Sequence, residues 1–188
     1  MQDIDLSILY FFNQTLASPA MDAVMAALTS VKWWMPVYIL SGIYLIWKYK
    51  WRGVIVLLSA VLVVAFTDQL AQLVLKPLAD RLRPCADVAG QTVVEWIRLP
   101  IGMRHGPSFP SSHALNNAAV ALFFGLVFRN KTVLYVLLAL ATLVGISRMY
   151  LGLHYPTDIL GGLIIGSIIG ACFALLYTRF LPQARRIS

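Results

Sequence analysis

The sequence has few charged residues and contains no linker that could separate two domains. Of its 188 residues only 12% are charged, whereas 60% are hydrophobic. A soluble globular domain carries about 25% charged residues, so this composition excludes that class and indicates an integral membrane protein. Because the apolar segments follow one another closely, without a Gly/Ser-rich or charge-rich stretch and without an internal repeat, we expect a single domain over residues 1–188.

Cysteine is scarce as well. Cys85 lies in a polar stretch and Cys172 in an apolar one. We therefore expect no disulfide between them and assign them no role beyond that of free thiols.

The first 17 residues lack the basic flank of a cleavable signal peptide and carry Asp3 and Asp5 instead. The apolar residues of this segment recur at helical spacing: Ile4, Ile8, Phe11, Phe12 and Leu16. Polar residues lie between them. The pattern predicts a short amphipathic helix lying at a membrane surface.

Basic residues outnumber acidic ones and give a formal net charge of +7. A nucleic-acid-binding domain gathers its lysines and arginines on one hydrophilic face. Here they lie at the ends of apolar segments or inside three short polar blocks. The charge therefore does not indicate nucleic acid as a partner, and the expected surroundings are membrane lipids.

Five segments are apolar over roughly the 20 residues that a spanning helix needs. They cover residues 31–49, 53–75, 112–128, 132–150 and 157–180. Residues 20–30 predict a short helix before the first of them. The expected fold class is all-α, a polytopic membrane bundle of five transmembrane helices with a short interfacial amphipathic helix at its N-terminus.

Positive charges outside the polar blocks indicate the orientation in the membrane, because cytoplasmic loops are enriched in lysine and arginine. They gather in the turns after the first and third segments and beyond the fifth: Lys48, Lys50, Arg52, Arg129, Lys131, Arg179, Arg185 and Arg186. These turns and the C-terminus should be cytoplasmic in the cell (inner) membrane. All eight acidic residues and all three histidines fall at or towards the opposite side, so the N-terminus and the chemistry should face the periplasm or exterior.

Three polar blocks interrupt the apolar sequence. They are residues 76–84, residues 110–113, and Ser147 and Arg148 followed by His154 and Asp158. With five alternating spans, all three blocks reach the outward face at headgroup depth although they are far apart in the sequence. Unrelated polar patches would fall on either face at random, so this convergence indicates a site.

The residue types in the blocks suit a multiply charged phosphate. Lys76, Arg83 and Arg148 can neutralise charge on its oxygens, and phosphoryl transfer depends mainly on such preorganised positive charge. Ser111 begins the third apolar segment, so the first free amides of that helix should point towards the anion.

Two of these residues suit a nucleophile and its orienting partner. His154 and Asp158 are four residues apart, and Pro156 between them fits the first turn of a helix. The carboxylate can therefore reach back to one imidazole nitrogen and leave the other nitrogen free to attack.

The order and spacing of the blocks resemble the signature of the type 2 phosphatidic acid phosphatase (PAP2) superfamily, in its integral-membrane lipid phosphatase branch. A lysine, six residues and then Arg-Pro match Lys76, Arg83 and Pro84. Pro-Ser-Gly-His matches Pro110, Ser111 and His113, and Ser-Arg, five residues, His, three residues and Asp match Ser147, Arg148, His154 and Asp158. Ser112 replaces the glycine of this signature, and we expect activity to survive with an altered pocket size because serine still offers a backbone N–H.

The resemblance implies a lipid phosphatase that works without a metal or other cofactor, through a phosphohistidine intermediate. By position, His154 would attack phosphorus, Asp158 would orient its ring, and His113 would protonate the leaving oxygen and later help to activate water. The phosphate oxygens would be held by Lys76, Arg83, Ser111, Ser112 and Arg148. The expected substrate is a lipid phosphate or diphosphate, with undecaprenyl diphosphate first and phosphatidylglycerol phosphate, phosphatidic acid and lipid A as alternatives.

The sequence leaves three other functions open. His113, His154 and Asp158 could ligate zinc or iron in a metal-dependent hydrolase, although the three neighbouring cations oppose a divalent ion. A lipid phosphotransferase would share the chemistry but pass phosphate to an acceptor other than water. A transporter or channel that merely binds phosphate is the third, but transporters usually show repeat symmetry and broken helices, and neither is evident.

The remaining polar residues near the blocks have simpler assignments. We expect Arg81 to pair with Asp80 or with a loop carbonyl, and Arg104 and His105 to lie on the rim of the site. Asp68, within the second span, needs a polar partner at that depth.

For Asp68 two interpretations are equally favoured: it holds Lys76 or Arg148 in place, or it makes a simple polar contact between helices. Glycines at every fourth position favour close packing of helices within the bundle, with a homodimer as the weaker alternative. These glycines are Gly162, Gly166 and Gly170.

Overall fold

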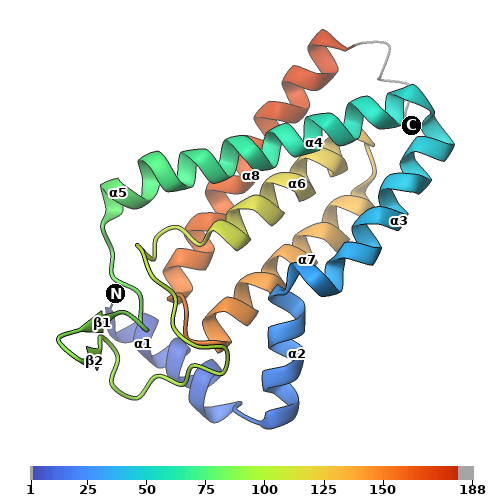
Figure 1. The fold of residues 1–188 in the computed structure, drawn as a ribbon. Coiled ribbons are helices and arrows are strands. Elements are labelled where there is room, and N and C mark those ends of the chain that lie inside the picture. Colours follow the sequence, from blue (N-terminus) through green and yellow to red (C-terminus); the bar gives the residue numbers. More distant parts are fainter. Residues whose placement is uncertain (1, 182–188) are drawn as a thin grey trace.

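The computed structural model describes residues 2–181 as a bundle of helices (Figure 1). The α-helices are α1 Gln2–Tyr10, α2 Pro19–Thr29, α3 Val31–Tyr49, α4 Trp51–Leu70, α5 Lys76–Ala79, α6 Ser112–Val127, α7 Lys131–Tyr150 and α8 Pro156–Phe180. Two π-helical turns follow α1 and α4, namely η1 Phe11–Thr15 and η2 Ala71–Leu75. A short antiparallel pair, β1 Asp87–Val88 and β2 Gln91–Thr92, lies in the long loop before α6. Apart from this pair, the described chain is helix and loop, as predicted.

Within residues 2–181, three helical runs are long and apolar enough to cross a membrane: Trp51–Ala79, which joins α4, η2 and α5, and the helices α7 and α8. α2 and α3 meet the same condition only together, and they are bent by 46° relative to each other. α6 has 16 residues, fewer than the roughly 20 that a span needs. By length and composition the structure thus provides three or four spans, and the count of five stays a prediction.

The local sequence explains where α2 begins. Pro19 takes the first helical position, where its missing N–H is not needed. The side chain of Ser18 accepts a hydrogen bond from the backbone N–H of Met21 at 3.2 Å, which caps the helix. The predicted short helix over residues 20–30 is confirmed with nearly the same ends.

The start of α8 is fixed in a similar way. Pro156 occupies its first turn, and the carboxylate of Asp158 accepts a hydrogen bond from the backbone N–H of Tyr155 at 2.8 Å. This bond satisfies one of the amides that have no partner inside the helix. It also holds the carboxylate of Asp158 at the very beginning of α8.

α6 lies at the centre of the bundle and packs against α4, α7 and α8. Its backbone approaches that of α8 closely, because an added Cβ on three α8 glycines would collide with carbonyl oxygens: Gly162 with Ser111, Gly166 with Leu115, and Gly170 with Ala119. Close packing within the bundle, which the glycine pattern favoured, is confirmed. The glycine face is therefore occupied by α6, and the homodimer stays a prediction.

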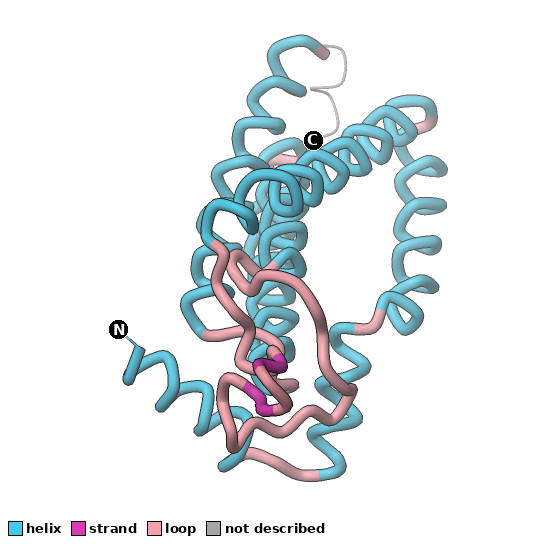
Figure 2. The backbone as a smooth tube through the Cα atoms, turned by 60° about the vertical axis from the view of Figure 1, so that its left-hand side comes forward, coloured by secondary structure: helices cyan, strands magenta, loops and turns pink. Residues whose placement is uncertain are grey.

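The two ends of the bundle differ in composition. The α3–α4 turn, the α6–α7 turn and the C-terminal end of α8 lie together at one end (Figure 1), where the rings of Tyr49 and Phe128 stack with centroids 6.0 Å apart. This end carries the basic turns of the predicted cytoplasmic side. The opposite end holds the long loop between α5 and α6, drawn in pink in Figure 2, and the link between α7 and α8 (Figure 1). The three polar blocks therefore meet at one end, as predicted.

Buried hydrogen bonds fasten the N-terminal segment to this loop-rich end. Asn13 in η1 is fully buried, and its amide group donates to the backbone oxygens of Arg98 at 2.9 Å and Tyr150 at 2.7 Å. The backbone N–H of Arg98 in turn donates to the Asn13 side-chain oxygen at 2.9 Å. α1 leaves apolar side chains exposed, among them Ile4 and Ile8. Its predicted place at a membrane surface remains a prediction.

Candidate active site

A small cavity at the loop-rich end brings together residues from all three polar blocks. It has a volume of about 220 Å³, and its lining includes Lys76, Arg83, Ser112, His113, Arg148 and His154. These side chains come from α5, from the loop after it, from the first turn of α6, from the last turn of α7, and from the link before α8. Six of the eight predicted site residues therefore face one small space.

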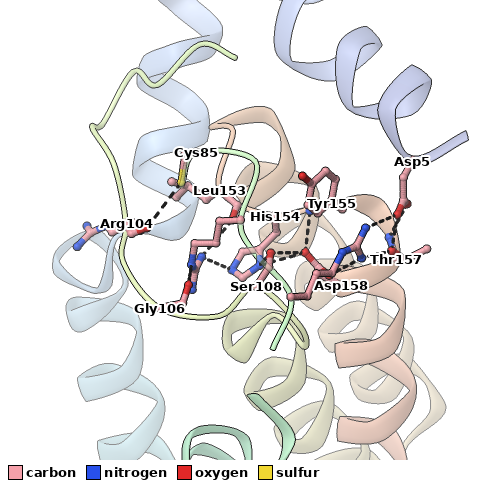
Figure 3. A network of polar contacts seen from close by, with 12 residues as sticks. Asp5, Cys85, Arg104, Gly106, Ser108, Leu153, His154, Tyr155, Thr157 and Asp158 are labelled. Atoms are coloured by element: carbon pink, nitrogen blue, oxygen red, sulfur yellow. Dashed lines mark hydrogen bonds and ion pairs between the residues drawn. The ribbon is translucent and has the colours of Figure 1, made fainter. Parts of the chain in front are cut away.

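The ring of His154 contacts different groups at its two nitrogens (Figure 3). Nε2 lies 3.0 Å from Nη1 of Arg83. A guanidinium donates hydrogen bonds and cannot accept them, so Nε2 is the acceptor and the ring proton belongs on Nδ1. Nε2 therefore presents its lone pair towards the basic side chains of the cavity.

The other nitrogen of the ring faces Ser108 and Asp158. Nδ1 of His154 lies 3.3 Å from the hydroxyl of Ser108 and 3.6 Å from Oδ2 of Asp158. The Ser108 hydroxyl donates to the same Oδ2 at 2.5 Å. The predicted approach of Asp158 to His154 is present, but Ser108 bridges the two groups. Nothing in its sequence surroundings marked Ser108, because this contact exists only once the loop has folded over α8.

Burial lowers the pKa of His154 to about 4, because the charged imidazolium would lose its hydration in this site. The cations Arg83 and Arg148 act in the same direction, whereas the carboxylate of Asp158 opposes them. The ring is only 2% exposed. At neutral pH the imidazole is therefore neutral, which is the form a nucleophile requires.

Asp158 is fully buried, and its second oxygen is held by Arg81. Nη1 of Arg81 donates to Oδ1 of Asp158 at 2.8 Å, and Nη2 donates to Asp5 at 2.7 Å. The prediction that Arg81 pairs with Asp80 or a loop carbonyl is wrong. Asp80 is exposed at the end of α5, where its backbone is left-handed and turns the chain away. Nη1 of Arg81 also donates to the hydroxyl of Thr157 at 2.6 Å. All three partners of Arg81 are distant in the sequence, so neighbouring residues gave no signal for them.

Three cations surround the cavity. Arg83 is oriented by two backbone oxygens, that of Gly106 with Nε at 3.0 Å and that of Leu153 with Nη1 at 3.0 Å. Nη1 of Arg148 donates to the hydroxyl of Thr29 on α2 at 3.1 Å. Lys76 is only 7% exposed and makes no ion pair within 4 Å among residues 2–181. An anion in the cavity would therefore meet positive charge from several sides.

Buried polar atoms without a hydrogen-bond partner also indicate an anionic ligand. Among the described residues, the buried side-chain polar atoms without a hydrogen-bond partner are Oγ of Ser111, Oγ of Ser112, Nε of Arg148 and the hydroxyl of Tyr177. An unsatisfied buried polar group costs about 1–3 kcal/mol. The first three belong to predicted phosphate-binding residues, and the oxygens of a bound phosphate would supply acceptors for those that face the cavity.

Ser111 and Asp158 do not line the cavity. The backbone N–H of Ser111 donates to the backbone oxygen of Asp158 at 3.0 Å, which joins the start of α6 to that of α8. The first intrahelical bond of α6 is donated by Leu115 to Ser111. The amides of Ser112, His113 and Ala114 precede that bond, so they are the free N–H groups that this helix start offers.

A larger cavity of about 740 Å³ adjoins the small one and shares Gln72, Lys76, Arg83, His113 and Arg148 with it. One wall is the face of α2 that carries Ala23, Ala26 and Ala27. Arg104 and His105 line only the large cavity, in agreement with their predicted place on the rim.

Asp68 lines the small cavity together with Gln72 and Asn116. Neither Gln72 nor Asn116 belongs to a polar block, so the sequence gave no reason to single them out. Asp68 makes no ion pair within 4 Å in the described chain, but its charge acts on Lys76 across the cavity. Its carboxylate thus offsets part of the positive charge.

Residues 2–181 contain no group of three or more His, Cys, Asp or Glu side chains placed to hold a metal ion. The nitrogen of His154 that would have to coordinate a metal lies 3.0 Å from the cationic Nη1 of Arg83. Electrostatic repulsion by Arg83 opposes a divalent ion at that position.

Comparison with known proteins identifies this arrangement. Residues 52–186 match the sequence model of the PAP2 superfamily. The chain belongs to the PAP2 superfamily. The match covers all three polar blocks and leaves out α1, α2 and α3.

Similar proteins agree with this assignment of the PAP2 chain. It is 35% identical over 176 residues to a lipid A 4'-phosphatase of Bacteroides thetaiotaomicron. This alignment covers 92% of this chain and 76% of the relative. It is 32% identical over 167 residues to phosphatidylglycerophosphatase B of Bacillus subtilis, with coverage of 82% and 74%. A crystal structure of a transmembrane PAP2-type phosphatidylglycerolphosphate phosphatase from Bacillus subtilis superposes with a TM-score of 0.66 at 26% identity, over 95% of this chain and 87% of that one. The PAP2 chain is an integral-membrane phosphatase.

Proposed function

We propose that this PAP2 enzyme hydrolyses a phosphate group on a membrane lipid through a covalent phosphohistidine at His154, without a metal ion. The observation that supports this most is the small cavity, where the lone pair of Nε2 faces the same space as Lys76, Arg83 and Arg148. A phosphate bound there would place phosphorus beside a neutral imidazole with cations around its oxygens.

In the first step the Nε2 lone pair of His154 forms a bond to phosphorus while the bond from phosphorus to the lipid oxygen breaks. His113, at the start of α6, would protonate that departing oxygen. Asp158, through Ser108 and its own 3.6 Å approach to Nδ1, stabilises the positive charge that develops on the ring. Ser112 and the three cations hold the oxygens of the transferring group.

In the second step water attacks phosphorus and His113 accepts its proton. The N–P bond then breaks, inorganic phosphate leaves, and His154 returns to its neutral form. Ser111 contributes by positioning the start of α6, because its N–H is bonded to the Asp158 carbonyl and is not free for substrate.

A membrane arrangement is part of the same proposal, supported by the basic turns at one end of the bundle and the polar blocks at the other. We propose five spans, with α6 among them and the loop-rich end at the exterior or periplasmic face of the cell membrane. At 1.5 Å per residue, the 16 residues of α6 measure about 24 Å, less than the roughly 30 Å hydrocarbon layer. With α6 centred in that layer, Ser112 and His113 would lie just below the headgroup boundary. The N-terminus would be outside and the basic end cytoplasmic, with residues 1–188 acting as one domain.

The large cavity favours a substrate with a bulky polar headgroup. At about 740 Å³ it is more than three times the volume of the small cavity. A phosphorylated glycolipid of the lipid A kind would place sugar there, as the 4'-phosphatase relative suggests. Undecaprenyl diphosphate, the first choice from the sequence, is the second candidate, because Arg104 at the rim offers charge for a second phosphate. Phosphatidylglycerol phosphate and phosphatidic acid have smaller headgroups and rank lower.

The test is phosphate release from detergent-solubilised lipid A, phosphatidylglycerol phosphate, phosphatidic acid and undecaprenyl diphosphate by purified enzyme. His154→Ala should abolish release, and ³²P-labelled substrate should leave acid-labile, alkali-stable label on the wild type only. Label transferred to a second lipid instead of water would indicate a phosphotransferase. Equal release by His154→Ala would refute the assigned nucleophile.

A further inference from the structure

We propose that Asp5 and Arg81 are positioning residues for the phosphoryl transfer, so that the N-terminal helix α1 orients the carboxylate beside the nucleophilic histidine. This inference rests on the proposed function, since it concerns the residues around His154. Asp5 lies outside the part of the chain that matches the superfamily model. Its role would be a feature of this chain and not of the shared blocks.

The two oxygens of the Asp158 carboxylate accept hydrogen bonds from different groups. Oδ2 faces the histidine and accepts from Ser108 and from the backbone N–H of Tyr155 at 2.8 Å. Oδ1 accepts from Arg81 at 2.8 Å. The guanidinium of Arg81 also lies over the ring of Tyr155, 4.1 Å from its centroid. With both oxygens held, the carboxylate cannot rotate away from His154 without losing a charged hydrogen bond.

Asp5 fixes Arg81 from the opposite side. Its Oδ2 accepts from Nη2 of Arg81 at 2.7 Å and from the hydroxyl of Thr157 at 2.6 Å, and its Oδ1 accepts from the backbone N–H of Thr157 at 3.1 Å. Asp5 is 4% exposed, whereas Ile4 beside it is 66% exposed. A carboxylate is rarely buried without a partner, and here the partners are Arg81 and the first turn of α8.

The charges of this group explain why both residues are present. Arg81 lies between two carboxylates, so the three side chains carry one net negative charge beside the imidazole. Without Asp5, the full positive charge of Arg81 would act on Asp158 and weaken its support of a developing imidazolium. Without Arg81, two buried carboxylates would repel each other with no cation between them.

Neither Asp5 nor Arg81 lines either cavity. A loss of these side chains should therefore change turnover and leave substrate binding nearly unchanged. This split distinguishes a positioning role from general damage to the fold, which would lower the fraction of active enzyme without changing the state of the His154 ring.

The first comparison is Asp5→Asn against Asp3→Asn, measured as kcat and KM for phosphate release from lipid A by full-length enzyme. Asp3 is an exposed acid on the same helix and makes no ion pair in the described chain. Asp5→Asn should lower kcat about tenfold with KM within about twofold, and Asp3→Asn should leave both unchanged. Asp5→Glu, which keeps the charge, should recover part of the loss if Asp5→Asn is poorly folded.

The second comparison uses the charge balance. Arg81→Met should lower kcat more than Asp5→Asn does, because it leaves two unpaired carboxylates. Adding Asp5→Asn to Arg81→Met should then raise kcat about threefold above that of Arg81→Met alone, since one of the repelling charges is gone. In ¹⁵N spectra of labelled histidine, Arg81→Met should reduce the fraction of His154 in the Nδ1–H form.

The possible results distinguish a failure of the proposed function from a failure of the positioning role. A wild-type enzyme that releases no phosphate from any substrate in the panel refutes the proposed function itself. An active wild type for which Asp5→Asn equals Asp3→Asn, or for which the double variant is no better than Arg81→Met, overturns the positioning role and leaves the nucleophile untouched.

Discussion

The imidazole of His154 is held from both sides, and the two contacts decide which nitrogen can attack phosphorus. Arg83 faces Nε2 at 3.0 Å, and the Ser108–Asp158 pair faces Nδ1. When phosphate enters, its oxygens can accept from Arg83 and leave the lone pair of Nε2 free. In the proposed mechanism the arginine thus selects the ring tautomer before substrate binds and then contacts the phosphate.

Replacing Asp158 with Asn should lower kcat about 10³-fold or more, because the amide removes the charge that stabilises the ring as it becomes positive. KM should change little, since Asp158 does not line the cavities. Ser108→Ala removes the bridge but keeps the carboxylate and should cost less. Steady-state kinetics on one substrate measure this, with the exposed acid Asp80→Asn as control. A turnover number for Asp158→Asn equal to that of the control would contradict the pairing.

The ring of His154 should stay neutral well below the ordinary titration range of histidine. Its pKa is lowered to about 4 in the folded protein, whereas an unfolded chain titrates near 6.5. The unfolded state therefore binds more protons between these values, so the stability contributed by the neutral ring is present above about pH 6.5 and is lost as pH falls towards 4.

Ring ¹⁵N shifts of histidine-labelled enzyme should show His154 as the Nδ1–H tautomer at pH 5.5, with the signal assigned by its disappearance in His154→Ala. Arg83→Gln should raise the pKa, because one nearby cation is removed. A wild-type titration midpoint near 6.5 would rule out the buried neutral state.

The residues that the sequence identified are those with a fixed spacing in the polar blocks. Lys76, Arg83, His113, Arg148 and His154 all reach the small cavity, because short helices and links place them at one end of the bundle. Ser108 and the Asp5–Arg81 pair could not be identified in this way. Their partners are set by how the long loop and α1 pack on α8, and no local spacing encodes that contact.

Helix α2 forms the wall that sets the size of the large cavity. Ala23, Ala26 and Ala27 share the face that lines it, at the three- and four-residue spacing of one helix side. Thr29 also lines this cavity. It is uncharged, and its hydroxyl accepts a hydrogen bond from Arg148 at 3.1 Å. α2 therefore combines a smooth wall with a contact that holds a cation of the site in place.

Ala26→Leu should exclude bulky headgroups and spare small ones. The added side chain occupies space where a sugar headgroup would lie, so kcat/KM for lipid A should fall at least about tenfold. The value for phosphatidic acid should stay within about threefold. Ala20→Leu is the matched control, because Ala20 is an exposed position of the same helix outside the cavity. An equal loss for both substrates would show that α2 does not determine headgroup size.

The ends of the helices were predictable because Pro, Ser and charged residues lie at the ends of the apolar segments. The segment 31–49 corresponds to α3 residue for residue, and 132–150 and 157–180 begin one residue after α7 and α8. The 46° bend between α2 and α3 was not predicted. α2 packs against α7, and the apolar pattern of the sequence does not contain that contact.

The contact between α6 and α8 keeps together the two histidines of the proposed mechanism. His113 lies in the first turn of α6, and His154 directly precedes α8. The Ser111 N–H joins the two helix starts by its bond to the Asp158 carbonyl at 3.0 Å. A change in the distance between these helices should therefore alter the site even when it is made far from the cavity.

Gly166→Ala tests this dependence, because Gly166 lies in the middle of α8 against the Leu115 carbonyl of α6. In an isolated helix the change would stabilise by up to about 1 kcal/mol. Here the new Cβ overlaps a backbone oxygen that no rotamer change can move, and overpacking costs typically about 1–3 kcal/mol or more. The thermal midpoint in detergent should fall, and kcat should fall with it as His113 is pushed away from His154.

Gly42→Ala is the control, since its Cβ would meet only the end of Leu57 at an ordinary 3.8 Å. This variant should leave kcat unchanged and the thermal midpoint unchanged or slightly raised. A Gly166→Ala enzyme as stable and as active as Gly42→Ala would mean that the α6–α8 spacing does not hold the site together.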